Sequence, residues 1–552
     1  MLSETLDPES GDYISEVLMQ FALRDLTIGE VLSTQATRHR DKPCLVFETV
    51  SFTYQEVELE TNRLANGLGS AGVNFGEHVA VMLGNGPEIL LSIFALGKLG
   101  AVAVPLNTSA RGKGLAYNLD HADATTLIAD AQFLPHIAAI IHVTSSLKRL
   151  IIVGEPPSGA DLPAGLIVLK FNDLRSSNTL APKTDVKYND QAFLMYTSGT
   201  TGPSKAVMYT HAYALTWAGG FADAHSYRSD DIMYVSMPLF HGNALHSATY
   251  GCLLVGATVV IKPKFSASKF WRDIYIHRAT LTNLLGSMGD ILWNLDPSEY
   301  ERKNTLRQIM AGPIPDRGRQ MEERWHVQLV SCFGLTDFGV SNFSTVDDPP
   351  GKFGSCGLAS PHFEVRIVDD NDFEVPDGQL GEIVLRTKTP WHSASGYYKM
   401  PTETAASLRN QWFHTGDLGI RDADGFLYFK DRKKDAIRRR GENISAFEVE
   451  QVLMDYEGIA EVCAYAVAID GDEEVGVSLI TTPGHNFVPA DLIRWCEGRM
   501  SYFMVPRFID TREDLPRTES GKIQKHSLRT DAQSNVKQLW DRVSEGIEVG
   551  RL

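Results

Sequence analysis

Apolar runs of strand length alternate with amphipathic segments from about residue 27 onward, and this alternation restricts the possible folds more than any other feature. Residues 79–83 form an uninterrupted apolar run, and Pro87 is suited to the first turn of the helix that follows. Residues 54–68 have the spacing of an amphipathic helix. Strands that alternate with helices usually pair in parallel, because each helix carries the chain back across the sheet. The sequence therefore predicts an α/β fold with a parallel-rich sheet.

The chain is too long for one hydrophobic core. At 552 residues it should contain two or more domains. Residues 357–385 are β-rich, and a charged run at residues 430–435 precedes about 115 residues with an α+β pattern. We expect a large N-terminal domain, residues 1–433, with several subdomains, parallel-rich sheets and a small β-rich subdomain. A small mobile C-terminal α+β domain, residues 434–552, should follow.

One apparent nucleotide motif is misleading. Residues 67–72 match the dinucleotide fingerprint G-x-G-x-x-G, but they end a predicted helix and do not follow a strand. We interpret them as a helix C-terminal turn.

Charge and cysteine content narrow the function classes. The formal charge of 52 − 69 = −17 argues against nucleic-acid and anionic-membrane partners. The six cysteines are scattered, without the spacing of a zinc site or a disulfide framework. The acidic N-terminus lacks the features of a signal peptide, and the apolar stretch 89–106 carries Lys98 and reads as a buried helix and strand. We expect a cytoplasmic monomer or homodimer.

Residues 196–205 combine hydroxyls, glycines and one lysine behind a short apolar run. Hydroxyl donors, backbone amides freed by glycine and a cation can together surround phosphate oxygens. The stretch does not fit G-x-x-x-x-G-K-[ST], because Lys205 is followed by Ala206. Taken alone, such a cluster is as consistent with an ordinary turn as with a phosphate site. The candidate phosphate-binding residues are Thr197, Ser198, Gly199, Thr200, Thr201, Gly202 and Lys205.

Five further stretches have the chemistry of a nucleotide-activating enzyme, and one of them is the charged run with Arg432 and Lys434. A small-residue turn around Gly312 could approach a flat base, and Thr336 with Asp337 pairs a hydroxyl with a carboxylate. Asp417 could accept both hydroxyls of a ribose. Lys522 lies on a glycine turn in the sequence P-R-T-E-S-G-K-I.

In this order and spacing the motifs resemble those of the adenylate-forming (AMP-binding) superfamily of acyl-CoA synthetases, adenylation domains and luciferases. The similarity covers about residues 27–528 and is most specific in Y-T-S-G-T-T-G-x-x-K and P-R-T-x-x-G-K-I. Residues 239–244 and 264–271 look most like the crotonobetaine/carnitine-CoA ligase branch.

The resemblance implies roles for the nucleotide-contacting residues. The stretch 197–205 would hold the β- and γ-phosphates of ATP, and Gly312 would face adenine. Asp417 and Arg432 would bind the ribose. Thr336 would contact the α-phosphate, Asp337 would hold Mg²⁺, and Lys522 would stabilise the charge that develops during attack by the substrate carboxylate.

The resemblance also implies an acid site, a hinge and a CoA site. His241 would lie at the carboxylate end of the acid, although a hydrogen-bonded core histidine is the alternative. Lys434 would be the hinge of the C-terminal domain. The acid pocket would include Phe240, Asn243, Ser287, Met288 and Gly339. The CoA site would include Arg438, Arg439, Arg440, Gly441, Glu442 and Asn443, although the three arginines could equally form a solvated face.

The chain departs from the family pattern at three places. Glutamate is usual where Asp337 stands, glycine is usual at Ala206, and Pro-Ser precedes Lys205. The expected function is a two-step ligase, in which an acid and Mg²⁺-ATP form acyl-AMP and pyrophosphate and CoA then displaces AMP. One alternative is an enzyme that loads a carrier protein; the carrier would be a separate protein, because the roughly thirty residues after Lys522 are too few for a fused carrier domain. The other alternative is a non-catalytic nucleotide-binding protein. The small or polar pocket residues favour a compact polar acid.

Overall fold

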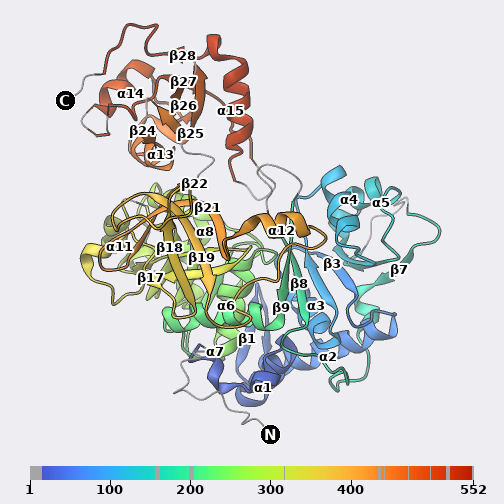
Figure 1. Ribbon diagram of the computed structural model, residues 1–552. Helices are drawn as coiled ribbons and strands as arrows, with labels where there is room; N and C mark the ends of the chain where they lie inside the picture. Colours follow the sequence, from blue (N-terminus) through green and yellow to red (C-terminus); the bar gives the residue numbers. More distant parts are fainter. Residues whose placement is uncertain are drawn as a thin grey trace. The chain divides into compact units, whose positions relative to one another are not determined.

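The computed structural model describes residues 15–155, 162–197, 204–315, 317–432, 437–439, 442–444, 446–469, 472–497, 499–500, 502–517 and 522–549 (Figure 1). Contacts divide the chain into two compact units. The first comprises most of the chain up to Val365 together with Leu385–Phe413, and the second comprises Arg366–Val384 and the chain from His414 onward. The predicted domain boundary at Lys434 lies outside the described residues.

A seven-stranded sheet lies in the first unit and has the order β7-β6-β5-β3-β4-β8-β9. Its pairs are parallel except for the antiparallel pair β8/β9, which confirms the predicted parallel-rich sheet. The strands are β3 (His78–Met82), β4 (Val102–Pro105), β5 (Thr126–Asp130), β6 (Arg149–Val153), β7 (Ile167–Lys170), β8 (Gln191–Tyr196) and β9 (Ala206–Thr210).

Both faces of this sheet are buried at β3, which explains the continuous apolar run of that strand. Val79 and Val81 belong to one hydrophobic core, whereas Ala80 and Met82 belong to another on the opposite face. Because successive side chains of a strand point to opposite faces, a strand covered on both sides needs apolar residues at every position.

A second seven-stranded sheet has the order β14-β13-β12-β10-β11-β1-β2. It is parallel except for the hairpin β1/β2. The strands are β1 (Pro43–Phe47), β2 (Val50–Thr53), β10 (Ile232–Val235), β11 (Thr258–Ile261), β12 (Leu281–Leu285), β13 (Gln308–Gly312) and β14 (Gln328–Val330).

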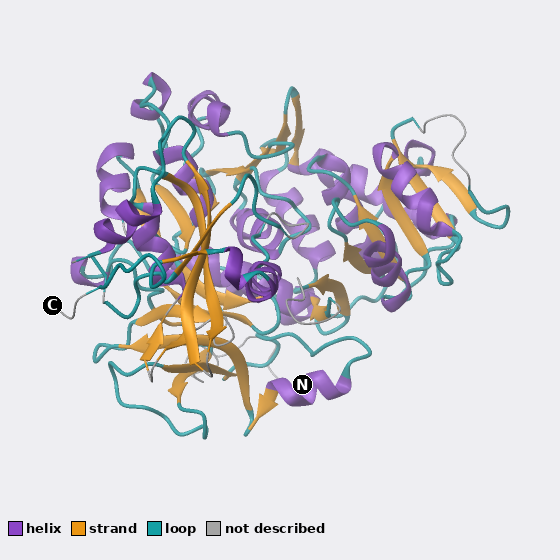
Figure 2. Ribbon diagram, turned by 90° about the horizontal axis from the view of Figure 1, so that it is seen from above, coloured by secondary structure: helices purple, strands orange, loops and turns teal. Residues whose placement is uncertain are grey.

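Helices flank the strands of the first unit (Figure 2). They are α1 (Ile28–His39), α2 (Tyr54–Ser70), α3 (Pro87–Leu99), α4 (Gly112–His121), α5 (Leu134–Ile141), α6 (His211–Ala224), α7 (Gly251–Val255), α8 (Ala267–His277), α9 (Gly286–Trp293), α10 (Glu299–Arg302), α11 (Gly318–Trp325) and α12 (Pro401–Ser407). Thr53 caps α2 through a reciprocal hydrogen-bonded pair with Glu56. The fingerprint-like residues 67–72 do end α2, and Gly72 adopts φ 89° as expected for a turn after a helix.

The smaller β-rich region consists of two further sheets. One has the order β15-β16-β17, and in the other β18-β19-β21-β20 is extended by β22, which pairs with β21. The strands are β15 (Cys332–Leu335), β16 (Gly339–Phe343), β17 (Leu358–Ala359), β18 (Phe363–Val368), β19 (Gly381–Thr387), β20 (Leu408–Arg409), β21 (Trp412–Arg421) and β22 (Leu427–Arg432). These sheets confirm the β-rich subdomain predicted from residues 357–385.

The C-terminal part of the second unit is a layered α+β fold. Its four-stranded sheet, β25-β26-β27-β28, packs α13 and α14 on one face through Val449 and Leu492, and α15 on the other through Leu528. The elements are β23 (Ile437–Arg439), β24 (Glu442–Ile444), α13 (Ala446–Met454), β25 (Ile459–Ile469), β26 (Asp472–Thr481), α14 (Pro489–Cys496), β27 (Phe508–Thr511), α15 (Lys525–Ser534) and β28 (Trp540–Asp541).

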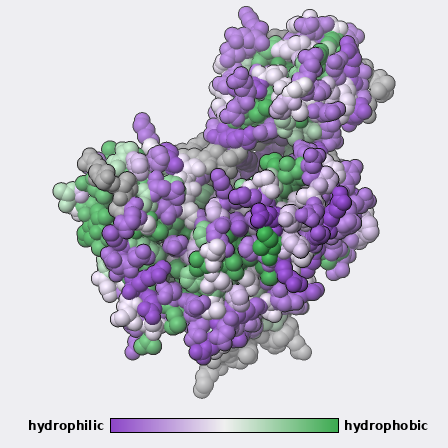
Figure 3. Space-filling view, turned by 180° about the vertical axis from the view of Figure 1, so that it is seen from behind, coloured by the Kyte–Doolittle hydropathy of each residue, from purple (hydrophilic) through white to green (hydrophobic). Residues whose placement is uncertain are grey.

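Hydrophilic side chains predominate on the face seen in Figure 3, with apolar side chains in patches between them. Among the described residues, no helix has the length and apolar character needed to cross a bilayer.

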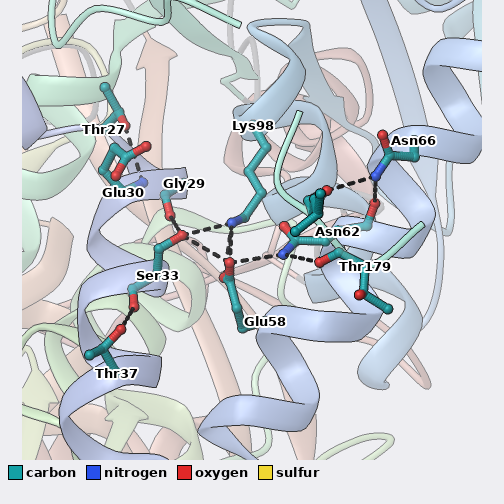
Figure 4. A network of polar contacts seen from close by, with 11 residues as sticks. Thr27, Gly29, Glu30, Ser33, Thr37, Glu58, Asn62, Asn66, Lys98 and Thr179 are labelled. Atoms are coloured by element: carbon teal, nitrogen blue, oxygen red, sulfur yellow. Dashed lines mark hydrogen bonds and ion pairs between the residues drawn. The ribbon is translucent and has the colours of Figure 1, made fainter. Parts of the chain in front are cut away.

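A buried ion pair joins α1, α2 and α3 (Figure 4). The Lys98 ammonium lies 2.7 Å from a Glu58 carboxylate oxygen and also donates to the Ser33 hydroxyl at 2.8 Å. Only 4% of the Lys98 side chain is exposed. The carboxylate accepts further hydrogen bonds from Ser33 and Asn62, so the buried charges are fully surrounded by partners.

Candidate active site

The predicted phosphate stretch lies at the tip of the β8/β9 hairpin. Tyr196 pairs with Ala206, and the Thr197 N–H donates to the Lys205 carbonyl at 2.9 Å. Residues 198–203 lie outside the described part of the chain. The predicted grip therefore connects two antiparallel strands, in contrast to phosphate loops that join a strand to a helix.

Lys205 lies over the ring of Tyr397. Its ammonium is 4.5 Å from the ring centroid, which is within the range of a cation–π contact. The two residues are neighbours because residues 396–398 run beside β9: the Met208 N–H donates to the Gly396 carbonyl at 2.9 Å, and the Tyr398 N–H donates to the Ala206 carbonyl at 2.8 Å.

Thr336 and Asp337 occupy the turn between β15 and β16. The turn is tight, because a side chain at Gly334 would place its Cβ 2.6 Å from the Val340 Cα. The hydroxyl of Tyr209, in β9, donates to the Thr336 carbonyl at 2.9 Å, and that of Tyr213, in α6, does so at 3.4 Å. Two tyrosines that follow the phosphate stretch therefore hold the backbone of this turn.

The Asp337 carboxylate also interacts with Tyr397. Burial raises the pKa of the Tyr397 phenol, and the nearby charge of Asp337 and a side-chain hydrogen bond with it raise the pKa further. Tyr397 is thus a protonated donor that contacts both the lysine of the phosphate stretch and the candidate metal carboxylate.

The candidate acid site begins at a π-helical segment, Asn243–Tyr250, which directly follows Phe240 and His241. Single π-helical turns occur often at functional sites. The His241 ring is accessible to solvent, yet desolvation by surrounding protein lowers its pKa to about 4. The imidazole is therefore neutral at physiological pH.

The other pocket candidates are Asn243, Ser287, Met288 and Gly339. Asn283 in β12 donates to the Asn243 side-chain oxygen at 2.7 Å, and Met288 in α9 is buried. The side chain of Ser287 lies outside the described part. Gly339 has φ 130°, and a Cβ there would lie 2.9 Å from the Phe363 ring, so this position requires glycine. Gly312 ends β13, and among the described residues no atom beyond its chain neighbours lies within 4 Å of the place a Cβ would occupy, which suits the approach of a flat ligand.

The predicted ribose residues lie together in the second unit. Asp417 and Arg432 are opposite each other in the β21/β22 pair, and the Arg432 Nε lies 3.5 Å from the Asp417 carboxylate. The Thr415 hydroxyl donates to the Ile383 carbonyl at 2.7 Å and accepts from the Asp417 N–H, which fixes the backbone before the carboxylate.

The remaining predictions fall in the C-terminal part of the chain. Lys522 is exposed next to Ile523, which forms an isolated bridge with Arg517. Lys434, Arg440 and Gly441 lie outside the described residues, as do the side chains of Arg438, Glu442 and Asn443 in the β23/β24 hairpin. Arg439 is buried, with its guanidinium 2.6 Å from Glu474 and bonded to the Phe503 carbonyl, an arrangement that favours a structural role over contact with CoA.

Sequence reasoning missed four residues that organise the site: Tyr209, Tyr213, Asn283 and Tyr397. Tyr397 lies 192 positions after Lys205 and outside the motifs quoted from the sequence. Its position beside Lys205 results from the pairing of residues 396–398 with β9, and no local sequence pattern predicts that pairing.

The chain matches the AMP-binding enzyme family over residues 32–398 and the AMP-binding enzyme C-terminal domain over residues 448–522. It is 33% identical over 506 residues to the crotonobetaine/carnitine–CoA ligases of Salmonella agona (strain SL483) and Salmonella typhimurium (strain LT2), which covers 89% of this chain and 96% of each relative. The chain therefore belongs to the AMP-binding enzyme family. Its relatives within this family are acyl-CoA ligases, and they confirm the similarity to the crotonobetaine/carnitine-CoA ligase branch that the motifs predicted.

Solved structures show the same fold. The anthranilate CoA ligase AuaEII in complex with anthranoyl-AMP is 25% identical with a TM-score of 0.84, covering 94% of this chain and 99% of that one. ATP-bound MatB from Rhodopseudomonas palustris is 24% identical with a TM-score of 0.79, covering 92% and 99%. The o-succinylbenzoate CoA synthetase of Bacillus subtilis, in complex with ATP and magnesium ion, is 24% identical with a TM-score of 0.77, covering 90% and 98%.

Proposed function

We propose that the protein activates a small carboxylic acid with Mg²⁺-ATP to an acyl-AMP and pyrophosphate, and then transfers the acyl group to CoA. The observation that carries the proposal is the convergence of Lys205 and the Thr336–Asp337 turn on Tyr397, in a chain whose relatives are CoA ligases. A cation and a carboxylate held at one place suit the polyphosphate of ATP and its metal.

The residues present fit a magnesium ion bound mainly through substrate phosphates. Among the described residues no cluster of three or more metal-ligating side chains occurs. Mg²⁺ in nucleotide enzymes commonly takes only one or two carboxylates and completes its shell with phosphates and water. Asp337 would hold it, and when bound the ion would offset phosphate charge.

The residues of the chain have separate roles in this reaction. The stretch 197–205 binds the β- and γ-phosphates, Asp417 and Arg432 bind the ribose, and Thr336 contacts the α-phosphate. Lys522 stabilises the charge that develops as the acid attacks, an effect of about 10²–10³ in rate for one preorganised group. Lys434 is the hinge about which the C-terminal domain turns between the two half-reactions.

The neutral His241 and the Asn243–Asn283 pair favour a compact polar acid over a long fatty acid. Crotonobetaine and carnitine, named in its relatives, are the first acids to test. Pyrophosphate release should be measured for these acids, anthranilate and a long-chain fatty acid, with and without CoA.

The proposal predicts AMP and pyrophosphate as products, and a thioester only when CoA is present. Release of ADP and phosphate would reject the chemistry. A preference for acids of about twelve or more carbons, whose chains gain roughly 0.8 kcal/mol per buried CH₂, would reject the assignment of the pocket.

A further inference from the structure

Tyr397 is held in place by its backbone on two sides. Residue 397 forms an antiparallel bridge with Val207, two positions after Lys205, and its N–H donates to the Thr404 hydroxyl of α12 at 2.9 Å. Gly396 precedes it with φ 107°, a conformation that side chains rarely adopt. These contacts fix the backbone of residue 397 to the strand that leaves the phosphate stretch.

The side chain of Tyr397 is buried between two charged groups. Its ring lies 4.5 Å from the Lys205 ammonium, and its hydroxyl faces the Asp337 carboxylate. We propose that Tyr397 is a positioning residue of the phosphate site, which holds Lys205 for the β- and γ-phosphates through its ring and orients Asp337 through its hydroxyl. The inference rests on the proposed function, since it assigns the same site.

A lysine side chain loses considerable rotamer freedom when it is fixed on a ligand. A ring that already restricts the ammonium reduces that loss on binding, which is the usual benefit of preorganisation. A partly buried cation–π contact is worth roughly five- to thirtyfold in an equilibrium constant. The gain should appear only for ligands that reach Lys205.

The neighbouring residue provides a matched control. The Tyr398 hydroxyl donates to the Asp123 carboxylate at 2.8 Å, which is the same kind of contact but involves neither Lys205 nor Asp337. Tyr398→Phe therefore removes a tyrosine–carboxylate hydrogen bond and leaves the contacts of Lys205 and Asp337 with Tyr397 in place.

The test measures binding of ATP and of AMP by calorimetry with Mg²⁺ and without acid, so that no turnover is needed. Tyr397→Leu should weaken ATP binding about five- to thirtyfold and leave AMP binding within about twofold, because AMP lacks the phosphates that Lys205 holds. Tyr398→Phe should leave both unchanged. Tyr397→Phe keeps the ring, so ATP binding at saturating Mg²⁺ should be near wild type, whereas the Mg²⁺ concentration needed for tight binding should rise several-fold.

A double-mutant cycle separates positioning from a merely structural role. If the Tyr397 ring acts through Lys205, then Tyr397→Leu should cost no further ATP affinity in a Lys205→Met background at saturating Mg²⁺, where the hydroxyl contact with Asp337 is not limiting. Additive effects, or equal losses for ATP and AMP, would overturn the inference.

The outcomes also separate this inference from the proposed function. Wild-type protein that fails to bind ATP would overturn both, whereas normal ATP binding with an unchanged ATP-to-AMP ratio in Tyr397→Leu would overturn only the role of Tyr397. If Tyr397→Leu does not fold, Tyr397→Phe alone tests the inference. An Mg²⁺ requirement for ATP binding that is unchanged in Tyr397→Phe would then overturn it.

Discussion

Asp337 is the clearest difference between this chain and the residue pattern of the family. Its carboxylate is one methylene shorter than the usual glutamate, and Tyr397 contacts it directly. Thr336 beside it is held through its carbonyl by Tyr209 and Tyr213, so the turn has little freedom to compensate for a shorter side chain.

Asp337→Asn should reduce adenylation by roughly 10²-fold at ordinary Mg²⁺, the effect of losing one preorganised charge, whereas Asp337→Glu should be close to wild type or better. The measurement is pyrophosphate release as a function of Mg²⁺ concentration. An unchanged Mg²⁺ dependence in Asp337→Asn would remove Asp337 from the metal site.

Burial of the His246 side chain makes the stability of the folded protein depend on pH. Its ring is fully buried among aromatic side chains, with Tyr209 stacked at 5.3 Å, and neither ring nitrogen has a hydrogen-bond partner in the described part of the chain. Burial lowers the pKa to about 3 from 6.5. The unfolded chain therefore binds a proton that the folded protein does not, and the stability contributed by this site is complete above pH 6.5 and is lost as the pH falls toward 3.

His246→Phe should leave stability at neutral pH nearly unchanged and reduce the loss between about pH 6.5 and pH 4.5 by roughly 2–3 kcal/mol. Urea unfolding at a series of pH values measures this, with the exposed His136→Asn as control. A parallel acid loss in His246→Phe and wild type would show that His246 does not carry the effect.

At the scale of elements, three helices share one buried charge pair. Lys98 in α3 and Glu58 in α2 bond to each other, and both contact Ser33 in α1 (Figure 4). Such a pair need not add net stability, but removing one partner leaves a buried charge without compensation.

Lys98→Ala should therefore destabilise the first unit by roughly 3–5 kcal/mol. The double variant Lys98→Met with Glu58→Leu should recover at least about 2 kcal/mol of this, because it removes both charges. Denaturant unfolding measures both. The exposed pair Lys303–Glu299 is the control, and Lys303→Ala should cost less than about 1 kcal/mol. A double variant no more stable than Lys98→Ala would show that packing, not charge, explains the loss.

At the scale of the whole molecule, the proposed mechanism gives two lysines different steps. Lys522 supplies charge to adenylation, whereas Lys434 absorbs the backbone rotation between half-reactions. Within the second unit, Asp431 accepts from the Phe447 N–H of α13 at 3.2 Å, so the chain just before the proposed hinge is anchored to the domain that would move.

Lys522→Ala should lower adenylation by about 10²-fold or more and still convert presynthesised acyl-AMP and CoA to thioester. Lys434→Pro, which restricts φ, should keep adenylation and lose thioester formation. The two half-reactions should be assayed separately in protein with a wild-type circular dichroism spectrum. Equal impairment of both half-reactions by both substitutions would reject alternation about Lys434.

Local patterns in the sequence were sufficient for the α/β class, for the positions of individual elements such as β3 and α3, and for the catalytic family. The run at residues 79–83 and Pro87 each restrict the backbone over a few residues, and β3 and α3 lie where those patterns predicted. The family followed from motifs such as 196–205, whose chemistry is contained in ten consecutive residues.

Only the tertiary structure decided which distant residues complete the site. Tyr397 reaches Lys205 because residues 396–398 pair with β9, and Asn283 reaches Asn243 because β12 ends near the π-helical segment. Arg439 looked like one member of a basic run, but folding placed it against Glu474. Periodicity and propensity act over a few neighbouring residues, whereas these contacts depend on the order and register of strands that are far apart in the chain.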